Sequence, residues 1–228
     1  MLCVQNTIFP LGQATMSSKL GLLMICSAWM LSASLTVVGA SETSMWSLNA
    51  DANYYNAKRA EFPVDYSVLP AYITAAASNE KYSALVDEYA RRIAKSSRWI
   101  LLQEINIEAS SYSAALLYMP ADERTWHAVA FGVVGGSPFR NKIRTVRNQQ
   151  LIEALSQEVQ SREDIDFSAS KVLDGTAAFI TSYSQGALNR MAVYEPLSSK
   201  SNSNSKIPYQ SLSRLVGEIK SAVSISHQ

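Results

Sequence analysis

Three stretches of β-favouring residues, joined by very short connections, constrain the fold of this 228-residue chain more than any other feature. The stretches span residues 98–108, 112–119 and 125–134 and are rich in Trp, Ile, Leu, Val, Tyr and Phe. Their connections, residues 109–111 and 120–123, consist of turn-forming residues. Parallel strands need a crossover of about a dozen residues or more, so these strands are expected to form an antiparallel meander.

Apolar residues that recur at three- and four-residue steps predict three helices around these strands. The first helix follows a cap at Ser78 or Asn79, and the last begins at about Tyr209. The three apolar stripes are Tyr82, Leu85, Val86, Tyr89 and Ile93; Leu151, Ile152, Leu155 and Val159; and Leu212, Leu215, Val216, Ile219 and Val223. Each stripe is typical of a helix that packs one side on a core.

A second pair of strands is predicted by residues 171–184 and 187–196, with Gln185 and Gly186 at the turn. Residues 198–206 are rich in Ser, Asn and Lys and are expected to form a loop. The order of elements predicts a single α+β domain. Its antiparallel sheet combines the three-strand meander with the hairpin, and its helices pack on one face.

Residues 1–40 are expected to be a signal peptide. An uncharged apolar run from Leu20 to Ala40 follows Lys19 and ends in small residues, the pattern at which a signal peptidase cleaves. Cleavage is expected after Ala40, and Met16 offers an alternative start for a shorter leader. The open alternative is an uncleaved anchor, because a run of about 20 apolar residues can cross a bilayer.

The rest of the chain is expected to act in the periplasm or outside the cell. Within it, residues 41–63 are an N-terminal arm without clear periodicity, and residues 64–228 form the domain. Cys3 and Cys26 both lie in the segment to be removed, which excludes disulfides, cysteine nucleophiles and thiolate zinc sites after cleavage. Loss of Lys19 leaves 19 basic against 19 acidic residues, a balance that does not favour nucleic acid.

One short string resembles a catalytic motif. Ser184 follows an apolar strand, and its string Tyr-Ser-Gln-Gly resembles the nucleophile elbow of cutinase-type serine hydrolases, in which a strained turn exposes the serine. Ser182 replaces the first glycine of that motif. The resemblance implies Ser184 as nucleophile, His227 as base and Glu195 or Glu218 as the acid.

The elbow and the predicted hairpin require incompatible structures. A hairpin needs a tight turn at Gln185 and Gly186 followed by a strand, whereas an elbow needs a helix from about Gly186 onward and a histidine beside Ser184. Tyr194 favours a strand, and Pro196 would stop a helix early. We therefore expect a strand across residues 190–194 and no histidine near Ser184.

The one local charge imbalance lies between Glu123 and Glu153, where no acidic residue occurs. The basic residues expected to form a patch there are Arg140, Lys142, Arg144 and Arg147. The first three share a face if the segment is extended, and the first, third and fourth share one if it is helical. The alternative to a binding patch is an ordinary solvated face.

The Gly-Gly-Ser-Pro string at 135–138 precedes this patch and is typical of a helix start. Ser137 is the expected cap and Pro138 the first helical residue. Free backbone amides at such a start favour an anionic group. Ser137 is therefore grouped with the four cations as a candidate binding residue.

Metal and acid–base chemistry have little support in the sequence. His127 and His227 are the only histidines, too few for a multi-histidine metal site, and His127 is expected to be a packing residue. The acids at 163–166 lack the spacing and the glycine of a calcium loop. Glu104 and Glu108 are four strand residues, or about 13 Å, apart, too far for a glycosidase pair. No metal or cofactor is expected.

These observations favour an exported, non-enzymatic binding or accessory domain. Its expected partner is a protein or a small anionic ligand, held by Ser137 and the basic residues of 140–147. The alternative is a small secreted serine hydrolase that uses Ser184. No nucleic-acid partner is expected, and no membrane span remains once the leader is cleaved.

Overall fold

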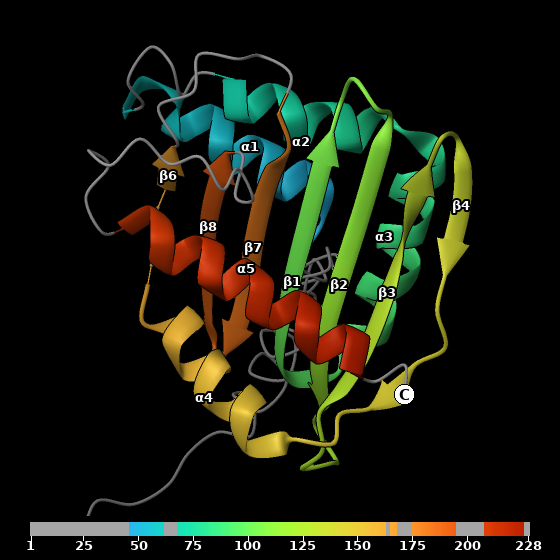
Figure 1. The fold of residues 1–228 in the computed structure, drawn as a ribbon, viewed down its shortest axis with the longest axis vertical. Coiled ribbons are helices and arrows are strands. Elements are labelled where there is room, and N and C mark those ends of the chain that lie inside the picture. The colour runs from blue at the N-terminus through green and yellow to red at the C-terminus, as the bar shows by residue number, and fades with distance from the viewer. Residues whose placement is uncertain (1–45, 62–67, 163–164, 168–174, 195–207, 226–228) are drawn as a thin grey trace, which may run out of the picture. The chain divides into compact units, whose positions relative to one another are not determined.

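The computed structural model describes residues 46–61, 68–162, 165–167, 175–194 and 208–225. Its centre is one sheet with the strand order β4-β3-β2-β1-β7-β8-β6, and β5 also pairs with β3 (Figure 1). The strands are β1 Ser96–Asn106, β2 Ser111–Pro120, β3 His127–Val134, β4 Ser137–Arg140, β5 Arg144–Thr145, β6 Ile165–Phe167, β7 Ala177–Ser184 and β8 Ala187–Tyr194. All described strand pairs are antiparallel except β6 with β8.

The expected meander and hairpin are confirmed. Strands β1, β2 and β3 pair in sequence order, and β7 joins the other side of β1, with Arg98 opposite Ser184 and Ile105 opposite Ala177. The β7–β8 hairpin therefore extends the meander into a wider sheet. Strand β1 lies at its centre, and its run of apolar residues suits a strand covered on both faces.

Alternation along the strands divides the core into two layers. Trp99, Leu101 and Ile105 of β1 point to one side, and Ile100 and Leu102 point to the other. Each side carries its own cluster of buried side chains. A sheet with two apolar faces needs a helical layer on each of them.

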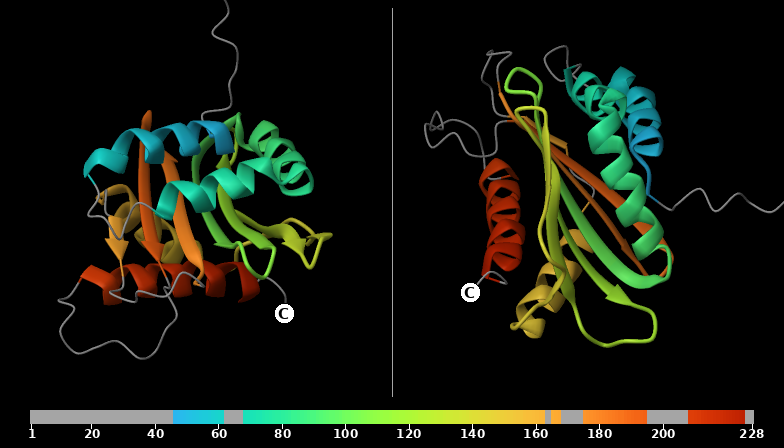
Figure 2. Two further views of the ribbon diagram at one scale, coloured as in Figure 1. Left: turned by 90° about the horizontal axis from the view of Figure 1, so that it is seen from above. Right: turned by 90° about the vertical axis from the view of Figure 1, so that its right-hand side faces the viewer.

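Helices cover both faces of the sheet (Figure 2). The helices α1 Leu48–Lys58, α2 Leu69–Ser78 and α3 Glu80–Ile93 lie on one face, and α4 Gln149–Gln160 and α5 Pro208–Ile225 lie on the other. The α+β class and the antiparallel sheet agree with the sequence-based expectation. That expectation placed the helices on one face, whereas the structure uses α4 and α5 to bury the second.

The first two helices were not predicted. Helix α1 and the short 3-10 turn η1 Arg59–Glu61 occupy the stretch that was expected to be an irregular arm. Ser47 caps α1 by accepting a hydrogen bond from the backbone N–H of Ala50, but the helix has no apolar stripe. Its buried residues are Leu48, Asp51 and Tyr55. The helix is therefore held by a few specific contacts and not by a periodic face.

Several expectations lie outside the described residues. They are the apolar run 20–40 with its cleavage point, the loop at 198–206, and the side chains of Glu195 and His227. Among the residues that are described, no helix is long and apolar enough to span a bilayer.

Candidate functional site

Ser184 lies at the end of β7, directly before a two-residue turn. Gln185 and Gly186 have φ angles of 51° and 86°, and Ser184 pairs with Ala187 at the start of β8. Two consecutive left-handed residues are typical of a type I′ hairpin turn. The chain continues as a strand through Tyr194 and not as a helix. The local structure that a nucleophile elbow requires is therefore missing around Ser184.

His127 is far from Ser184. It begins β3, which lies three strands away from β7, a separation of about 14 Å at the usual strand spacing. Its Nε2 lies 2.7 Å from a carboxylate oxygen of Glu123, and its ring stacks on Tyr118 at 5.4 Å. His127 thus has a hydrogen-bonded packing environment, as expected for a histidine in a half-buried strand.

The helix start expected at Ser137 is wrong. Gly135 and Gly136 have φ angles of 56° and 77°, and they form the turn of a β3–β4 hairpin in which Val134 pairs with Ser137. The helix that follows begins only at Gln149, where Asn148 is the cap. The Ser-Pro pair fits a helix start, but the two glycines before it adopt positive φ angles, which suit a hairpin turn. Ser137 therefore offers no helix N-terminus to an anion.

The predicted basic patch is divided by a bulge in the edge strand. The backbone N–H of Asn141 donates to the Ala130 carbonyl at 2.8 Å, and Arg144 pairs with Ala128. Two residues, Lys142 and Ile143, therefore oppose Val129 alone, which is the pattern of a β-bulge. The bulge reverses the alternation, so the cations on its two sides do not share a face.

The four cations consequently have different surroundings. Arg140 faces α3 and forms an ion pair with Glu88 at 3.0 Å. Arg144 lies in register with Ala128, whose side chain belongs to the core under α4 and α5. Lys142 and Arg147 are exposed and have no ion pair among the described residues. The fold therefore does not bring these four cations together on one face.

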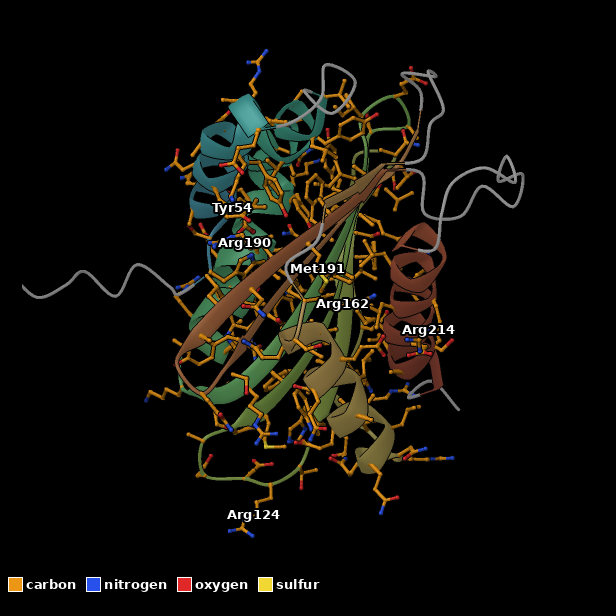
Figure 3. The ribbon with its side chains drawn as sticks, turned by 90° about the vertical axis from the view of Figure 1, so that its left-hand side faces the viewer. Tyr54, Arg124, Arg162, Arg190, Met191 and Arg214 are labelled. Atoms are coloured by element: carbon orange, nitrogen blue, oxygen red, sulfur yellow. The ribbon has the colours of Figure 1, made fainter. Side chains whose placement is uncertain are left out.

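A larger group of cations gathers at one end of the sheet. This end contains the last turn of α3, the start of β1, the β2–β3 loop, β5 and the connection to α4. We call the following seven residues the basic end: Arg91, Arg92, Lys95, Arg98, Arg124, Arg144 and Arg147. Figure 3 shows Arg124 at the tip of the β2–β3 loop, pointing away from the sheet.

Strand register brings these segments together. The last turn of α3 leads directly into β1, and the carbonyl of Lys95 accepts a hydrogen bond from the backbone N–H of Ala121 in the β2–β3 loop. Val146 donates its N–H to the carbonyl of Trp126 at 2.9 Å, which joins the β5 segment to the same loop. Segments 91–98, 121–127 and 144–147 therefore form one contiguous end of the domain.

Acidic residues offset only part of this charge. Glu88 pairs with Arg92 at 3.2 Å, and Glu153 pairs with Arg98. Asp122 and Glu123 lie in the β2–β3 loop, where Glu123 contacts His127. Seven basic and four acidic residues thus meet at this end. Lys95, Arg124 and Arg147 are exposed cations of this end that form no ion pair in the described part of the chain. Arg91 is also exposed, and its Nε donates to the carbonyl of Asp87 at 3.2 Å.

A second polar group is buried between α1 and the sheet, and no pattern in the sequence indicated it. Asp51 is 0% exposed and accepts hydrogen bonds from Arg190 Nε at 2.9 Å, Trp46 Nε1 at 3.1 Å and Gln103 Nε2 at 3.5 Å. Tyr82 Oη donates to Gln103 Oε1 at 3.0 Å, which links the group to α3. We call these five residues the Asp51 network.

The Asp51 network connects α1 to the sheet inside the protein. The guanidinium of Arg190 also lies 4.8 Å from the centre of the ring of Tyr54, a residue of α1 (Figure 3). Burial raises the pKa of Asp51 above its usual value, although the hydrogen bond and the charge of Arg190 act in the opposite direction. Both carboxylate oxygens of Asp51 accept hydrogen bonds from the protein itself. The carboxylate therefore holds α1 in place and has no oxygen left to bind a substrate.

No group of three or more metal-binding side chains occurs among the described residues. Glu104, one of the acids considered for catalysis, instead pairs with Lys220 of α5 at 2.9 Å. Comparison with protein-family models, with curated proteins and with solved structures found no match for the chain.

Proposed function

We propose that this chain is an exported, non-catalytic binding domain that holds an anionic partner at the basic end. One observation carries the proposal: Lys95, Arg124 and Arg147 gather at that end as exposed cations without an ion pair among the described residues. They come from three separate connections of the fold. Free cations concentrated on one surface create a local potential that attracts anionic partners even when net charge is near zero.

The distribution of charge along the sheet supports this surface. At the opposite end, the β1–β2 turn carries Glu108 and the β3–β4 turn has no charged residue. Lys81 lies there too, but its Nζ donates to the carbonyl of Gly136 at 2.6 Å. The two turns at that end therefore carry no basic residue, whereas the connections at the basic end carry three exposed cations without an ion pair among the described residues. A local excess of exposed cations attracts anionic partners.

A binding role is also favoured over hydrolysis by the surroundings of the alternative nucleophile. Ser184 precedes a hairpin turn, and His127 lies three strands away. A serine hydrolase needs a base within about 2.6–3.2 Å of the nucleophile. Export remains part of the proposal because of the apolar run at 20–40, and cleavage after Ala40 would release the domain.

The binding proposal is tested with a soluble polyanion. Poly-glutamate should bind the protein at low salt and lose affinity as salt screens the exposed charges. The triple variant Lys95→Gln, Arg124→Gln, Arg147→Gln should bind about tenfold more weakly, since each exposed pair contributes roughly 0.5 kcal/mol. Titration calorimetry or fluorescence anisotropy measures both effects.

The matched control is the triple variant Lys58→Gln, Arg59→Gln, Lys81→Gln, which removes the same charge elsewhere. These residues lie at the C-terminal end of α1, in η1 and at the start of α3. Equal weakening by both triple variants would show that only net charge matters and would reject the basic end as the site. Unchanged melting temperatures confirm that both variants are folded.

A further inference from the structure

We propose that the anionic partner of the basic end is a lipid surface that carries anionic headgroups. This inference rests on the proposed function and specifies its ligand. Three features of the described residues distinguish a lipid surface from a single anion or a peptide. They are the spread of the cations, the state of the neighbouring sheet edge, and the apolar side chains beside them.

The cations of the basic end are spread over a surface. They belong to α3, the α3–β1 connection, β1, the β2–β3 loop, β5 and the β5–α4 connection. A small anion is normally held by donors that converge on it, often in a bidentate arrangement. Cations such as Arg92 and Arg98 are instead turned to neighbouring carboxylates, and Arg124 points away from the domain (Figure 3). A spread set of charges matches a surface of many headgroups.

The sheet edge formed by β4 and β5, which reaches the basic end at β5, is unsuited to peptide binding by strand addition. Strand β4 contains Pro138, which has no N–H to donate, and the bulge at Lys142 and Ile143 interrupts the edge further along. Proline, bulges and cations are the devices that block edge-to-edge pairing. A protein partner would therefore lack the backbone hydrogen bonds on which strand addition depends.

Exposed apolar side chains lie next to these cations. Ile143 is 37% exposed on the bulge beside Arg144, and Leu151 is 44% exposed in the first turn of α4, close to Arg147 in the chain. Leu151 belongs to the stripe that was expected to be buried, so its exposure is a departure from the sequence-based pattern. Apolar side chains flanked by Lys and Arg are the composition of surfaces that enter the headgroup region of a bilayer.

The experiment uses the full chain and two kinds of vesicle, one of phosphatidylcholine alone and one of phosphatidylcholine mixed with phosphatidylglycerol. The apolar run would add to binding of both vesicles, so the readout is the ratio of the two affinities measured by co-sedimentation. We expect the wild type to prefer the anionic vesicles. The variant Lys95→Gln, Arg124→Gln, Arg147→Gln should lose most of this preference, up to about a hundredfold, because each cation near an anionic bilayer contributes about fivefold.

Two controls separate the lipid inference from the general one. The variant Lys58→Gln, Arg59→Gln, Lys81→Gln should keep the preference, and raised salt should abolish it in the wild type. Poly-glutamate is measured in parallel with the same proteins. Binding of poly-glutamate without any preference for anionic vesicles would reject the lipid surface and leave an acidic protein as the partner. Failure to bind either probe would reject the proposed function as well.

A second variant tests the apolar contribution. Ile143→Ser with Leu151→Ser leaves every charge in place and changes only exposed side chains, so the fold should be unaffected. If the domain enters the headgroup region, this variant should bind anionic vesicles several-fold more weakly but poly-glutamate unchanged. Equal loss on both probes would contradict insertion into a lipid surface.

Discussion

The face of the sheet under α1, α2 and α3 is aromatic and hydrogen-bonded, whereas the face under α4 and α5 is almost entirely aliphatic. The first core contains nine described aromatic residues, among them Trp46, Trp99 and Phe131, and Trp126 is the single aromatic residue in the described part of the second. Tyr89 stacks on Phe131 at 4.2 Å, and the Asp51 network runs through the first layer.

This difference changes what holds each helix layer in place. Leu, Ile, Val and Ala pack without a preferred direction, so the second layer depends mainly on buried area. Aromatic pairs and buried hydrogen bonds depend on geometry, so the first layer tolerates less displacement. We therefore expect the two faces to respond differently to the loss of one side chain.

The largest effect is expected from the Asp51 network. Replacement of Asp51 by Ala leaves the guanidinium of Arg190 and the indole N–H of Trp46 without their buried acceptor. Breaking a buried ion pair in this way typically costs about 3–5 kcal/mol of unfolding free energy. Urea unfolding followed by tryptophan fluorescence measures the loss. A cost below that of an exposed ion pair would mean that the first layer is not held by this network.

The pH dependence of stability, compared between the wild type and Asp51→Asn, tests the same network. Burial raises the pKa of Asp51 in the folded state, so protonation favours folding. This contribution is absent at neutral pH, grows as pH falls through the folded-state pKa, and is complete below the unfolded value of about 3.9. Asparagine does not titrate, so the wild type should gain stability relative to Asp51→Asn on acidification. If the difference in unfolding free energy between the wild type and Asp51→Asn shrinks on acidification, the folded-state pKa of Asp51 is lowered and not raised.

In the aliphatic layer, the loss of unfolding free energy should follow the buried volume that a substitution removes. Leu155 of α4 and Leu215 of α5 are 3% and 0% exposed, so replacing either by Ala should cost about 2–5 kcal/mol. Leu151→Ala, on the exposed side of α4, is the matched control and should cost far less. Similar losses in all three variants would show that burial does not decide what the loss of a leucine side chain costs in this layer. Thermal unfolding of the three proteins provides the comparison.

The same contrast explains how much of the fold could be predicted. Helices α3 and α5 were found because a periodic apolar stripe is the mark of a helix that packs by buried area. Helix α1 carries Asn, Asp and Ala where a stripe would be, and its anchor is Asp51, a residue that normally indicates a solvated position. Its partner Arg190 lies 139 residues away in the chain, so no local pattern relates them.

The residues of the candidate site likewise differ in whether they could be predicted from the sequence. The acid-free stretch located Lys142, Arg144 and Arg147, because charge is visible in the sequence. Their arrangement depends on the bulge, a single extra residue that no periodicity reveals. Arg124 and Lys95 join the basic end only because the meander brings the α3–β1 connection beside the β2–β3 loop. Tertiary structure, not sequence proximity, assembles this surface.

A smaller effect is expected at Gly132, where β3 passes close to its neighbours. A Cβ atom at this position would lie 2.3 Å from the carbonyl oxygen of Tyr112 and 2.8 Å from the Cα of Ser113. Both obstacles belong to the backbone of β2, so Gly132→Ala should cost about 1–3 kcal/mol as an overpacked site. Val134→Ala, an exposed position on the same strand, is the control and should change stability little. Equal stability of both variants would mean that β3 can shift away from the backbone of β2 at little cost in free energy.

The smallest effect, of opposite sign, is expected at Gly217 in α5. A Cβ atom there meets nothing within 4 Å, and the residue lies inside an 18-residue helix without a left-handed φ. Alanine is favoured over glycine in a helix interior by about 1 kcal/mol or less, because it restricts the unfolded chain without straining the folded one. Gly217→Ala should therefore raise the melting temperature by a few degrees. A gain is expected here because the added methyl group meets open space and so needs no change in the packing of the aliphatic layer. A destabilised Gly217→Ala protein would show that this position of α5 does not tolerate a side chain, and the proposed contrast between the two faces would then fail.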